Sequence, residues 1–379
     1  MQYNKIYLFP LMLLLAACAG GNRKKISGGD KLHTYEGIHY AKRFSIARGP
    51  DFCAVYLFGN RNNRDTTAAF LLSEKADSLP GYISVTIPCK KIAALSSIYA
   101  AMLCELGAER SLTAIDNVDY VNNQVVLEKF NKGQLKELAR TPEINIEQTI
   151  ALAPDMVFYY GMGDNDGEKD KRLKESGIPI AICLDHLEEH PLARAEWIKF
   201  FAVFVNRELE ADSIFAAVER NYLSLRRQAD TLNDREKPTV FSEIKLGEVW
   251  YMPGGRSFMA TLLKDAGGNY LWKDDGNYGS LPLSFEQVYA RARDADYWIN
   301  LPLVKTREQL VAREGRYASF KAFKTGRLYN NTRNTNRFGY SPYWETGMIH
   351  PDRILSDLVQ IFHPSLVQNE ELYYYEKLK

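Results

Sequence analysis

The stretch NIEQTIALAPDMVFYY, residues 145–160, is the most informative part of the sequence about the fold, because SFEQVYARARDADYWIN, residues 284–300, repeats its pattern. In both stretches a Glu precedes a Gln, an Ala stands four residues after the Glu, and an Asp stands eight residues after it. A polar residue before a short apolar run is typical of a helix start, and the aromatic and β-branched residues after the Asp favour a strand. Each stretch therefore predicts a helix followed by a strand, and the pair predicts two similar units.

Strand and helix patterns alternate around both stretches. Residues 90–118 show an apolar strand pattern, a helix pattern that ends at Gly107, and a second strand pattern. Later in the chain the same order returns, with a helix pattern that ends at Gly267. Such alternation predicts a sheet with helices on both faces. We therefore predict an α/β fold class with two lobes, 89–190 and 234–379, each a mostly parallel sheet with flanking helices.

The segment between the predicted lobes, 191–233, has apolar residues at helical spacing for about forty positions, without a Gly or an internal Pro. We predict that it forms one long rigid helix that joins the lobes. A bend at Asn206–Arg207 would divide it into two helices, which is the alternative. A stiff connection of this kind disfavours wide closure of the lobes.

The N-terminus has the pattern of an export signal. Lys5 precedes an apolar run that is shorter than the roughly 20 residues of a membrane-spanning helix and fits a signal peptide over 1–17. Residues Leu15–Cys18 resemble the bacterial lipobox, in which the Cys thiol is acylated. We predict a periplasmic protein, lipid-anchored to a membrane through Cys18, with 18–36 as a flexible tether. An ordinary signal peptide with a coincidental Cys is the alternative.

Residues 37–88 form an additional β-rich segment, with runs of strand-forming residues separated by Gly, Asn, Asp and Pro. We expect this segment to pack on the N-terminal lobe. The chain has 379 residues and 46% apolar content, which is ample for two cores. Its formal net charge of +1 gives no indication of a nucleic-acid partner.

The cysteines and acids do not predict a metal site. The four cysteines after Cys18 include no CxxC pair and no Cys/His cluster. A Cys53–Cys89 disulfide is compatible with an oxidising compartment and stays open. The acids within 164–170 have the spacing of a calcium loop, but Lys169 stands where that loop requires Gly. We predict no metal and no cofactor.

Four stretches together carry a resemblance to a known family: IAALSSIYAAMLCELGAERSLTAID (92–116), INIEQTIALAPDMVF (144–158), VWYMPGGRSFMATLLKDAGGNYL (249–271) and HPDRILSDLVQIFHP (350–364). Over roughly residues 88–365 the chain resembles the periplasmic substrate-binding proteins of ABC importers for metal chelates, namely ferric siderophores, haem and cobalamin. The resemblance implies two lobes joined by a rigid helix, with the ligand in the cleft between them. It leaves the role of 37–88 open.

The resemblance also implies a role for Glu147 and Glu286. In this family one Glu on each lobe docks on arginines of the two permease subunits, so the implied partners are an ABC permease dimer with its ATPase subunits, bound by a monomer. Helix capping is the alternative, because Asn145 and Ser284 stand at capping-box spacing. An acid in the first turn is also favoured by the helix dipole.

The ligand is expected among loops that follow strands in both lobes. The candidate ligand-binding residues are Ser96, Ser97, Tyr99, Asp119, Tyr120, Trp250, Tyr251, Arg256, Tyr278, Arg333, Arg337, Tyr340 and Trp344. The arginines suit an anionic ferric siderophore, and the aromatic rings suit a catecholate or corrin face. We predict capture of a ferric siderophore or similar metal chelate, with a corrinoid or haem as the alternative. A haem-ligating His or Tyr cannot be assigned.

A secreted α/β lipoprotein hydrolase is the alternative from another functional class. The sequence contains no nucleophile elbow and no HExxH motif, and its Ser, His and Asp residues form no triad-like arrangement. We therefore predict that the protein is not an enzyme.

Overall fold

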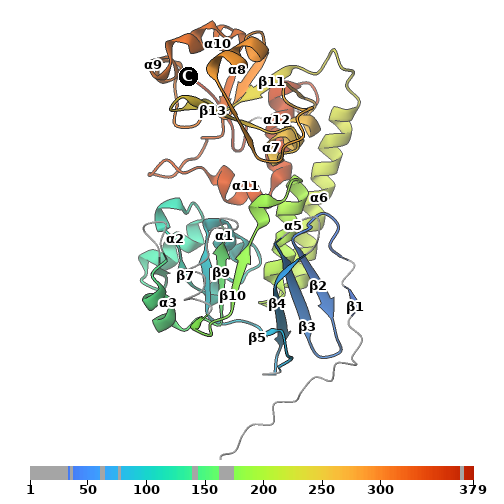
Figure 1. The fold of residues 1–379 in the computed structure, drawn as a ribbon, viewed down its shortest axis with the longest axis vertical. Coiled ribbons are helices and arrows are strands. Elements are labelled where there is room, and N and C mark those ends of the chain that lie inside the picture. Colours follow the sequence, from blue (N-terminus) through green and yellow to red (C-terminus); the bar gives the residue numbers. More distant parts are fainter. Residues whose placement is uncertain are drawn as a thin grey trace, which may run out of the picture.

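The computed structural model describes residues 33–34, 37–59, 65–75, 78–138, 144–161, 175–367 and 371–379. Two α/β lobes lie one above the other and are connected by helices that run along one side of the molecule (Figure 1). The predicted fold class is therefore confirmed. The predicted signal peptide, Cys18 and the acids within 164–170 lie outside the described residues.

The N-terminal lobe contains a five-stranded parallel sheet in the order β10-β9-β6-β7-β8. Its strands are β6 (Ile92–Leu95), β7 (Leu112–Ile115), β8 (Lys136–Glu137), β9 (Met156–Tyr160) and β10 (Ile180–Cys183). Its helices are α1 (Ser97–Glu105), α2 (Gln124–Asn131) and α3 (Ile146–Leu152). All residues of the central strand β6 are buried, which explains its continuous apolar sequence, because a central parallel strand is covered on both faces.

The C-terminal lobe contains a five-stranded sheet in the order β14-β11-β16-β17-β18, in which only the edge strand β18 is antiparallel. Its strands are β11 (Thr239–Ser242), β14 (Asn269–Tyr270), β16 (Tyr297–Ile299), β17 (Leu328–Asn330) and β18 (Glu376–Lys377). Its helices are α7 (Phe258–Asp265), α8 (Phe285–Ala292), α9 (Arg307–Arg313), α10 (Lys321–Lys324), α11 (Thr346–Ile349) and α12 (Pro351–Phe362).

A second, antiparallel sheet in this lobe was not predicted. It consists of β12 (Lys245–Leu246), β13 (Val249–Pro253) and β15 (Ser280–Leu283). The residues of β13 were interpreted as part of a ligand loop, but alternate residues of this strand point into the core, where Trp250 and Met252 are fully buried. This alternation is the period of two of a strand with one buried face.

The two lobes repeat one arrangement of strands, as the duplicated sequence stretches indicate. In the N-terminal lobe, β6 lies between β7, which follows α1, and β9, which follows α3. In the C-terminal lobe, β11 lies between β14, which follows α7, and β16, which follows α8. The helices that begin near Glu147 and Glu286 therefore occupy equivalent positions in two copies of one supersecondary unit.

The connection between the lobes consists of two helices, α5 (Pro191–Ala202) and α6 (Glu208–Asp230), and not one continuous helix. The break contains Asn206, which has a positive φ of 53° and ends the helical hydrogen-bond pattern. The predicted single helix is thus corrected to the alternative with a bend at Asn206–Arg207. The longer helix, α6, spans the side of the molecule toward the C-terminal lobe (Figure 1).

Helix α5 is buried on nearly all sides, because two sheets cover it (Figure 1). On one side the Phe200 ring meets Phe158 of β9 at a centroid distance of 5.9 Å, and on the other side it meets Phe44 at 5.6 Å. Phe44 belongs to the N-terminal sheet, in the order β1-β2-β3-β4-β5. Its strands are β1 (His33–Thr34), β2 (Phe44–Arg48), β3 (Cys53–Phe58), β4 (Thr66–Ser73) and β5 (Ile83–Thr86). This β-rich segment therefore covers the outer face of α5.

The thiols of Cys53, Cys89, Cys104 and Cys183 are free, so a Cys53–Cys89 disulfide is not formed. Within the described ranges no group of three or more His, Cys, Asp or Glu side chains is placed to hold a metal ion. None of the described helices is both long and apolar enough to cross a membrane.

Candidate functional site

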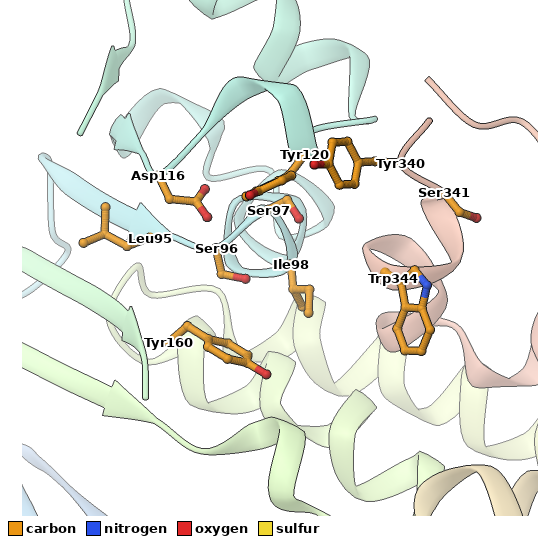
Figure 2. Close-up of a pocket in the computed structure, with 10 residues that line it drawn as sticks. All are labelled: Leu95, Ser96, Ser97, Ile98, Asp116, Tyr120, Tyr160, Tyr340, Ser341 and Trp344. Atoms are coloured by element: carbon orange, nitrogen blue, oxygen red, sulfur yellow. The ribbon is translucent and has the colours of Figure 1, made fainter. Parts of the chain in front are cut away.

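A cavity of about 330 Å³, here called the interlobe pocket, lies between the two lobes (Figure 2). Residues of both lobes line it: Leu95, Ser96, Ser97, Ile98, Asp116, Tyr120, Tyr160, Tyr340, Ser341 and Trp344. A concave site lined by aromatic rings and a few polar groups is the usual form of a small-molecule site.

The N-terminal lobe forms its side of the pocket at the carboxyl ends of three neighbouring parallel strands. Leu95 ends β6 and Ser96 follows it, Asp116 directly follows β7, and Tyr160 is the last residue of β9. Ligands bind at this edge in open parallel sheets, because the loops that leave the strand ends diverge there and leave a crevice. The position of the pocket therefore follows from the strand order β9-β6-β7.

The C-terminal lobe forms the opposite side with one segment, residues 336–350, here called the strap. The strap contributes Tyr340, Ser341 and Trp344 to the pocket, and Figure 2 shows the Tyr340 ring beside the Tyr120 ring. These two rings meet edge to face at a centroid distance of 4.6 Å. At the start of the strap, the Asn336 side-chain amide donates hydrogen bonds to backbone oxygens of the N-terminal lobe, at 2.8 and 3.1 Å.

Two acidic groups fasten the rest of the strap to the N-terminal lobe. The carboxylate of Glu345 is 1% exposed and accepts hydrogen bonds from the backbone N–H groups of Asn122, at 2.6 Å, and Asn123, at 2.8 Å. Burial raises the pKa of the Glu345 carboxyl to about 7. At the end of the strap, His350 Nε2 lies 3.3 Å from Glu105 Oε1 of α1. The strap thus joins the lobes at the pocket as well as forming its wall.

Asp116 is the one acidic residue among those that line the pocket. Its Oδ1 atom is buried and has no hydrogen-bond partner among the described residues. Burial is the main reason that the pKa of its carboxyl rises to about 6. The backbone N–H groups of Asn117 and Asp116 oppose this rise, and the Glu137 carboxylate adds to it. No Lys, Arg or His occurs among these lining residues. The pocket is therefore aromatic with an acid at one side.

Tyr160 lies opposite Asp116 in the pocket (Figure 2), and its ring stacks on the His186 ring at a centroid distance of 4.4 Å. Burial raises the pKa of the Tyr160 hydroxyl to about 12, so this hydroxyl is neutral and can donate a hydrogen bond. Arg194 lies nearby, but its guanidinium donates to the backbone oxygens of His186 and Glu188 and covers the Phe258 ring at 4.2 Å. The Arg194 guanidinium therefore already has partners within the protein.

Five of the thirteen predicted ligand-binding residues come together in the pocket: Ser96, Ser97, Tyr120, Tyr340 and Trp344. Two others have no exposed surface. Tyr99 lies in the core and donates to Asp185 Oδ1 at 2.6 Å. Trp250 packs on Trp298, and its Nε1 donates to the Ser242 backbone oxygen at 3.0 Å. Direct ligand contact by Tyr99 and Trp250 is therefore wrong for this conformation, because an apolar core surrounds both rings.

The predicted arginines do not line the pocket. Arg333 pairs with the Glu371 carboxylate, and Arg337 lies 4.6 Å from the centroid of its neighbour Phe338. Arg256 covers the Tyr278 ring at 4.1 Å. Tyr251 is exposed on β13, and Asp119 is half-buried beside Tyr120 without lining the pocket. The arginine pair expected for an anionic ligand is thus absent from the lining residues.

The interpretation of the sequence missed five lining residues: Leu95, Ile98, Asp116, Tyr160 and Ser341. Asp116 and Tyr160 carried a usable signal, because each stands at the carboxyl end of a correctly predicted strand. The rule that ligands gather at these ends favours the first residue after the strand over Asp119, which stands three residues further on. Ser341 carried no such signal, since tertiary contacts alone bring the strap to the pocket.

Glu147 and Glu286 are exposed at the starts of α3 and α8. Ser284 forms a complete capping box with Gln287, whereas at α3 Asn145 supplies only the side-chain cap. Glu286 also pairs with Arg316 at 3.0 Å, and its backbone amide and this arginine lower the pKa of its carboxyl. Since other residues cap both helices, capping does not require either Glu.

Comparison with known proteins agrees with this architecture. A family model described as "Periplasmic binding protein" matches residues 92–334. An uncharacterized lipoprotein of Methanocaldococcus jannaschii is 24% identical over 330 residues, covering 82% of this chain and 76% of that protein. A periplasmic heme-binding protein from Pseudomonas aeruginosa has a TM-score of 0.58 at 15% identity, covering 77% and 98% of the two chains. A triscatecholate siderophore-binding protein from Bacillus subtilis has a TM-score of 0.56 at 16% identity, covering 74% and 94%. The structural likenesses concern the fold.

Proposed function

Because this chain belongs to the periplasmic binding protein family, whose members bind solutes and are not enzymes, we propose that it is the substrate-binding component of an ABC importer. It captures a metal chelate in the interlobe pocket and delivers it to the permease. The observation that carries this proposal is the pocket itself, which joins three strand ends of one lobe to the strap of the other. The hydrolase alternative has no support in this family.

The aromatic lining favours a ligand with flat or apolar faces. The rings of Tyr120, Tyr160, Tyr340 and Trp344 surround the cavity (Figure 2), and such rings stack on catecholate, porphyrin or corrin faces. A volume of about 330 Å³ lies at the small end of the range for ligand pockets, so a large chelate would place part of its surface outside. Corrinoid and haem stay in consideration beside ferric siderophores.

Titration of the purified protein tests this proposal. Ferric triscatecholate, ferrioxamine B, cyanocobalamin and haemin are added in turn, and binding is followed by calorimetry and by tryptophan fluorescence. Saturable binding of at least one of them is expected. Absence of binding by all four would contradict the proposal, and measurable esterase or peptidase turnover would then favour the hydrolase alternative.

The proposed docking to the permease uses Glu147 and Glu286. They are exposed, they occupy equivalent positions in the two lobes, and neither is needed as a cap. A permease with two equivalent subunits would contact one Glu on each lobe. At Glu286 a permease arginine would join or replace Arg316, whose guanidinium also binds Glu314 at 2.8 Å.

Membrane attachment through Cys18 completes the proposal. The resemblance of residues 15–18 to a lipobox supports it, and so does the lipoprotein description of the archaeal relative. Metabolic labelling with a palmitate analogue should mark the wild-type protein and not Cys18→Ser. Equal labelling of both proteins would show that lipid is attached elsewhere or not at all.

A further inference from the structure

The acid in the interlobe pocket restricts the charge of the ligand. Asp116 lies at the carboxyl end of β7, and Figure 2 shows its carboxyl group directed toward Ser97 and Tyr120. Its buried Oδ1 has no hydrogen-bond partner among the described residues. A buried acceptor without a partner costs about 1–3 kcal/mol, so a ligand that supplies the donor recovers this free energy.

Among the described residues, no positively charged side chain acts on the Asp116 carboxyl, and only the backbone N–H groups of Asp116 and Asn117 favour its ionised form. The ionisable groups that act on it are Glu137, Glu345 and Tyr120, which are acids or a neutral hydroxyl. Arg194 acts on Tyr160, at the other side of the pocket, and donates to backbone oxygens. An anionic ligand would therefore meet like charge near Asp116, which is unfavourable in a partly desolvated site.

We propose that Asp116 determines ligand specificity, and that the pocket accepts a neutral or positively charged chelate that presents an N–H donor or an ammonium group to this carboxyl. Polyanionic chelates are disfavoured. This inference rests on the proposed function and deepens it, because it assigns the charge class of the ligand of the same pocket. It reverses the expectation of an anionic ligand that Arg333 and Arg337 suggested.

A pH dependence follows from the same geometry. The Asp116 carboxyl has a pKa of about 6, so it is mostly neutral at pH 5 and mostly ionised at pH 7.5. A cationic ligand binds the ionised form better, and its affinity should therefore rise between these two pH values. The affinity of a neutral ligand with amide donors should change less, because a neutral carboxyl still offers an acceptor oxygen.

The experiment compares three chelates on the full chain by calorimetry: monocationic ferrioxamine B, neutral cyanocobalamin and a trianionic ferric triscatecholate. N-acetylated ferrioxamine B, which lacks the ammonium group, is the ligand control. The expected order is tighter binding of the cationic or neutral chelate than of the trianion. Asp116→Asn should weaken the ferrioxamine B complex by about 10- to 100-fold, leave the acetylated compound within a few-fold, and not weaken the triscatecholate complex.

Asp119→Asn is the matched control, because it removes the same charge from the same loop without altering a lining residue. It should leave every affinity within about threefold. Tightest binding of the trianion by the wild type would overturn this inference alone and leave the proposed function intact. Equal losses of ferrioxamine B affinity in Asp116→Asn and Asp119→Asn would also overturn this inference and leave the proposed function intact. Absence of binding by all chelates would overturn the proposed function and this inference with it.

Discussion

Glu345 is predicted to control how firmly the two lobes are joined. Its carboxylate accepts the backbone N–H groups of Asn122 and Asn123, and the Asn122 side-chain amide approaches it at 3.3 Å. Glu345→Ala leaves two backbone donors without their acceptor in a buried interface. At about 1–3 kcal/mol for each unsatisfied donor, the free energy of unfolding should fall by about 2–6 kcal/mol. Water that enters the vacated space would place the result in the lower half of that range.

The same carboxyl predicts a dependence of stability on pH. Burial is the main reason that its pKa rises from 4.5 to about 7. Between these values the folded protein holds a proton that the unfolded chain has released, so stability falls as the pH rises through this window. The shift corresponds to roughly 3 kcal/mol at 1.36 kcal/mol for each pKa unit. The raised pKa of Asp116 also makes the free energy of unfolding fall with rising pH, up to about pH 6. The Glu345→Gln variant keeps this contribution of Asp116.

Urea unfolding at pH 5 and pH 8 measures both effects. The stability difference between wild type and Glu345→Gln should change by about 2.5 kcal/mol between the two pH values, with the wild type losing stability at pH 8. Glu248→Ala is the control, because Glu248 is 94% exposed and should change stability by less than about 0.5 kcal/mol. A Glu345→Ala protein within 1 kcal/mol of wild type at both pH values would refute the reasoning about the buried interface.

Three further predictions concern other parts of the chain. Glu196→Ala removes a buried carboxylate that accepts three backbone N–H groups of the N-terminal segment at 2.7–2.8 Å, and should cost about 3 kcal/mol or more in urea unfolding; an effect below 1 kcal/mol would contradict it. Trp344 is 54% exposed at the pocket while the other tryptophans are buried, so Trp344→Phe should abolish most ligand-dependent fluorescence quenching with calorimetric affinity largely kept. Trp250→Ala, which removes a core side chain, should instead lower the free energy of unfolding by about 3–5 kcal/mol. If Trp344→Phe and Trp250→Ala showed equal ligand-dependent quenching, the ligand would not bind beside Trp344 in the interlobe pocket. Glu147→Ala combined with Glu286→Ala should leave chelate affinity unchanged and abolish uptake in a transport assay, whereas lost chelate binding would exclude a pure docking role.

The fold was predictable to the extent that its signals are local. The helix-to-strand pattern repeats at 145–160 and 284–300 because each unit buries the same faces in its own lobe, and the strand order confirms the repeat. The antiparallel strand β13 and the division of α5 from α6 were harder to predict from the sequence. A five-residue strand has too few alternations to distinguish it from a loop. Helix α5 is covered on both sides, so its sequence shows no polar face to mark its end.

Local sequence patterns are enough to predict the family resemblance, the two related lobes and the half of the pocket at the strand ends, because a strand end and the residues after it are consecutive in the chain. The other half of the pocket depends on contacts between distant parts of the chain. The strap reaches the N-terminal lobe through Asn336 and Glu345, whose partners lie more than 200 residues away along the chain. Those contacts place Tyr340 and Trp344 opposite Asp116 and leave Arg333 and Arg337 outside the lining. The charge of the pocket is therefore a property of the assembled lobes, since no local pattern specifies which residues of a loop face a distant strand.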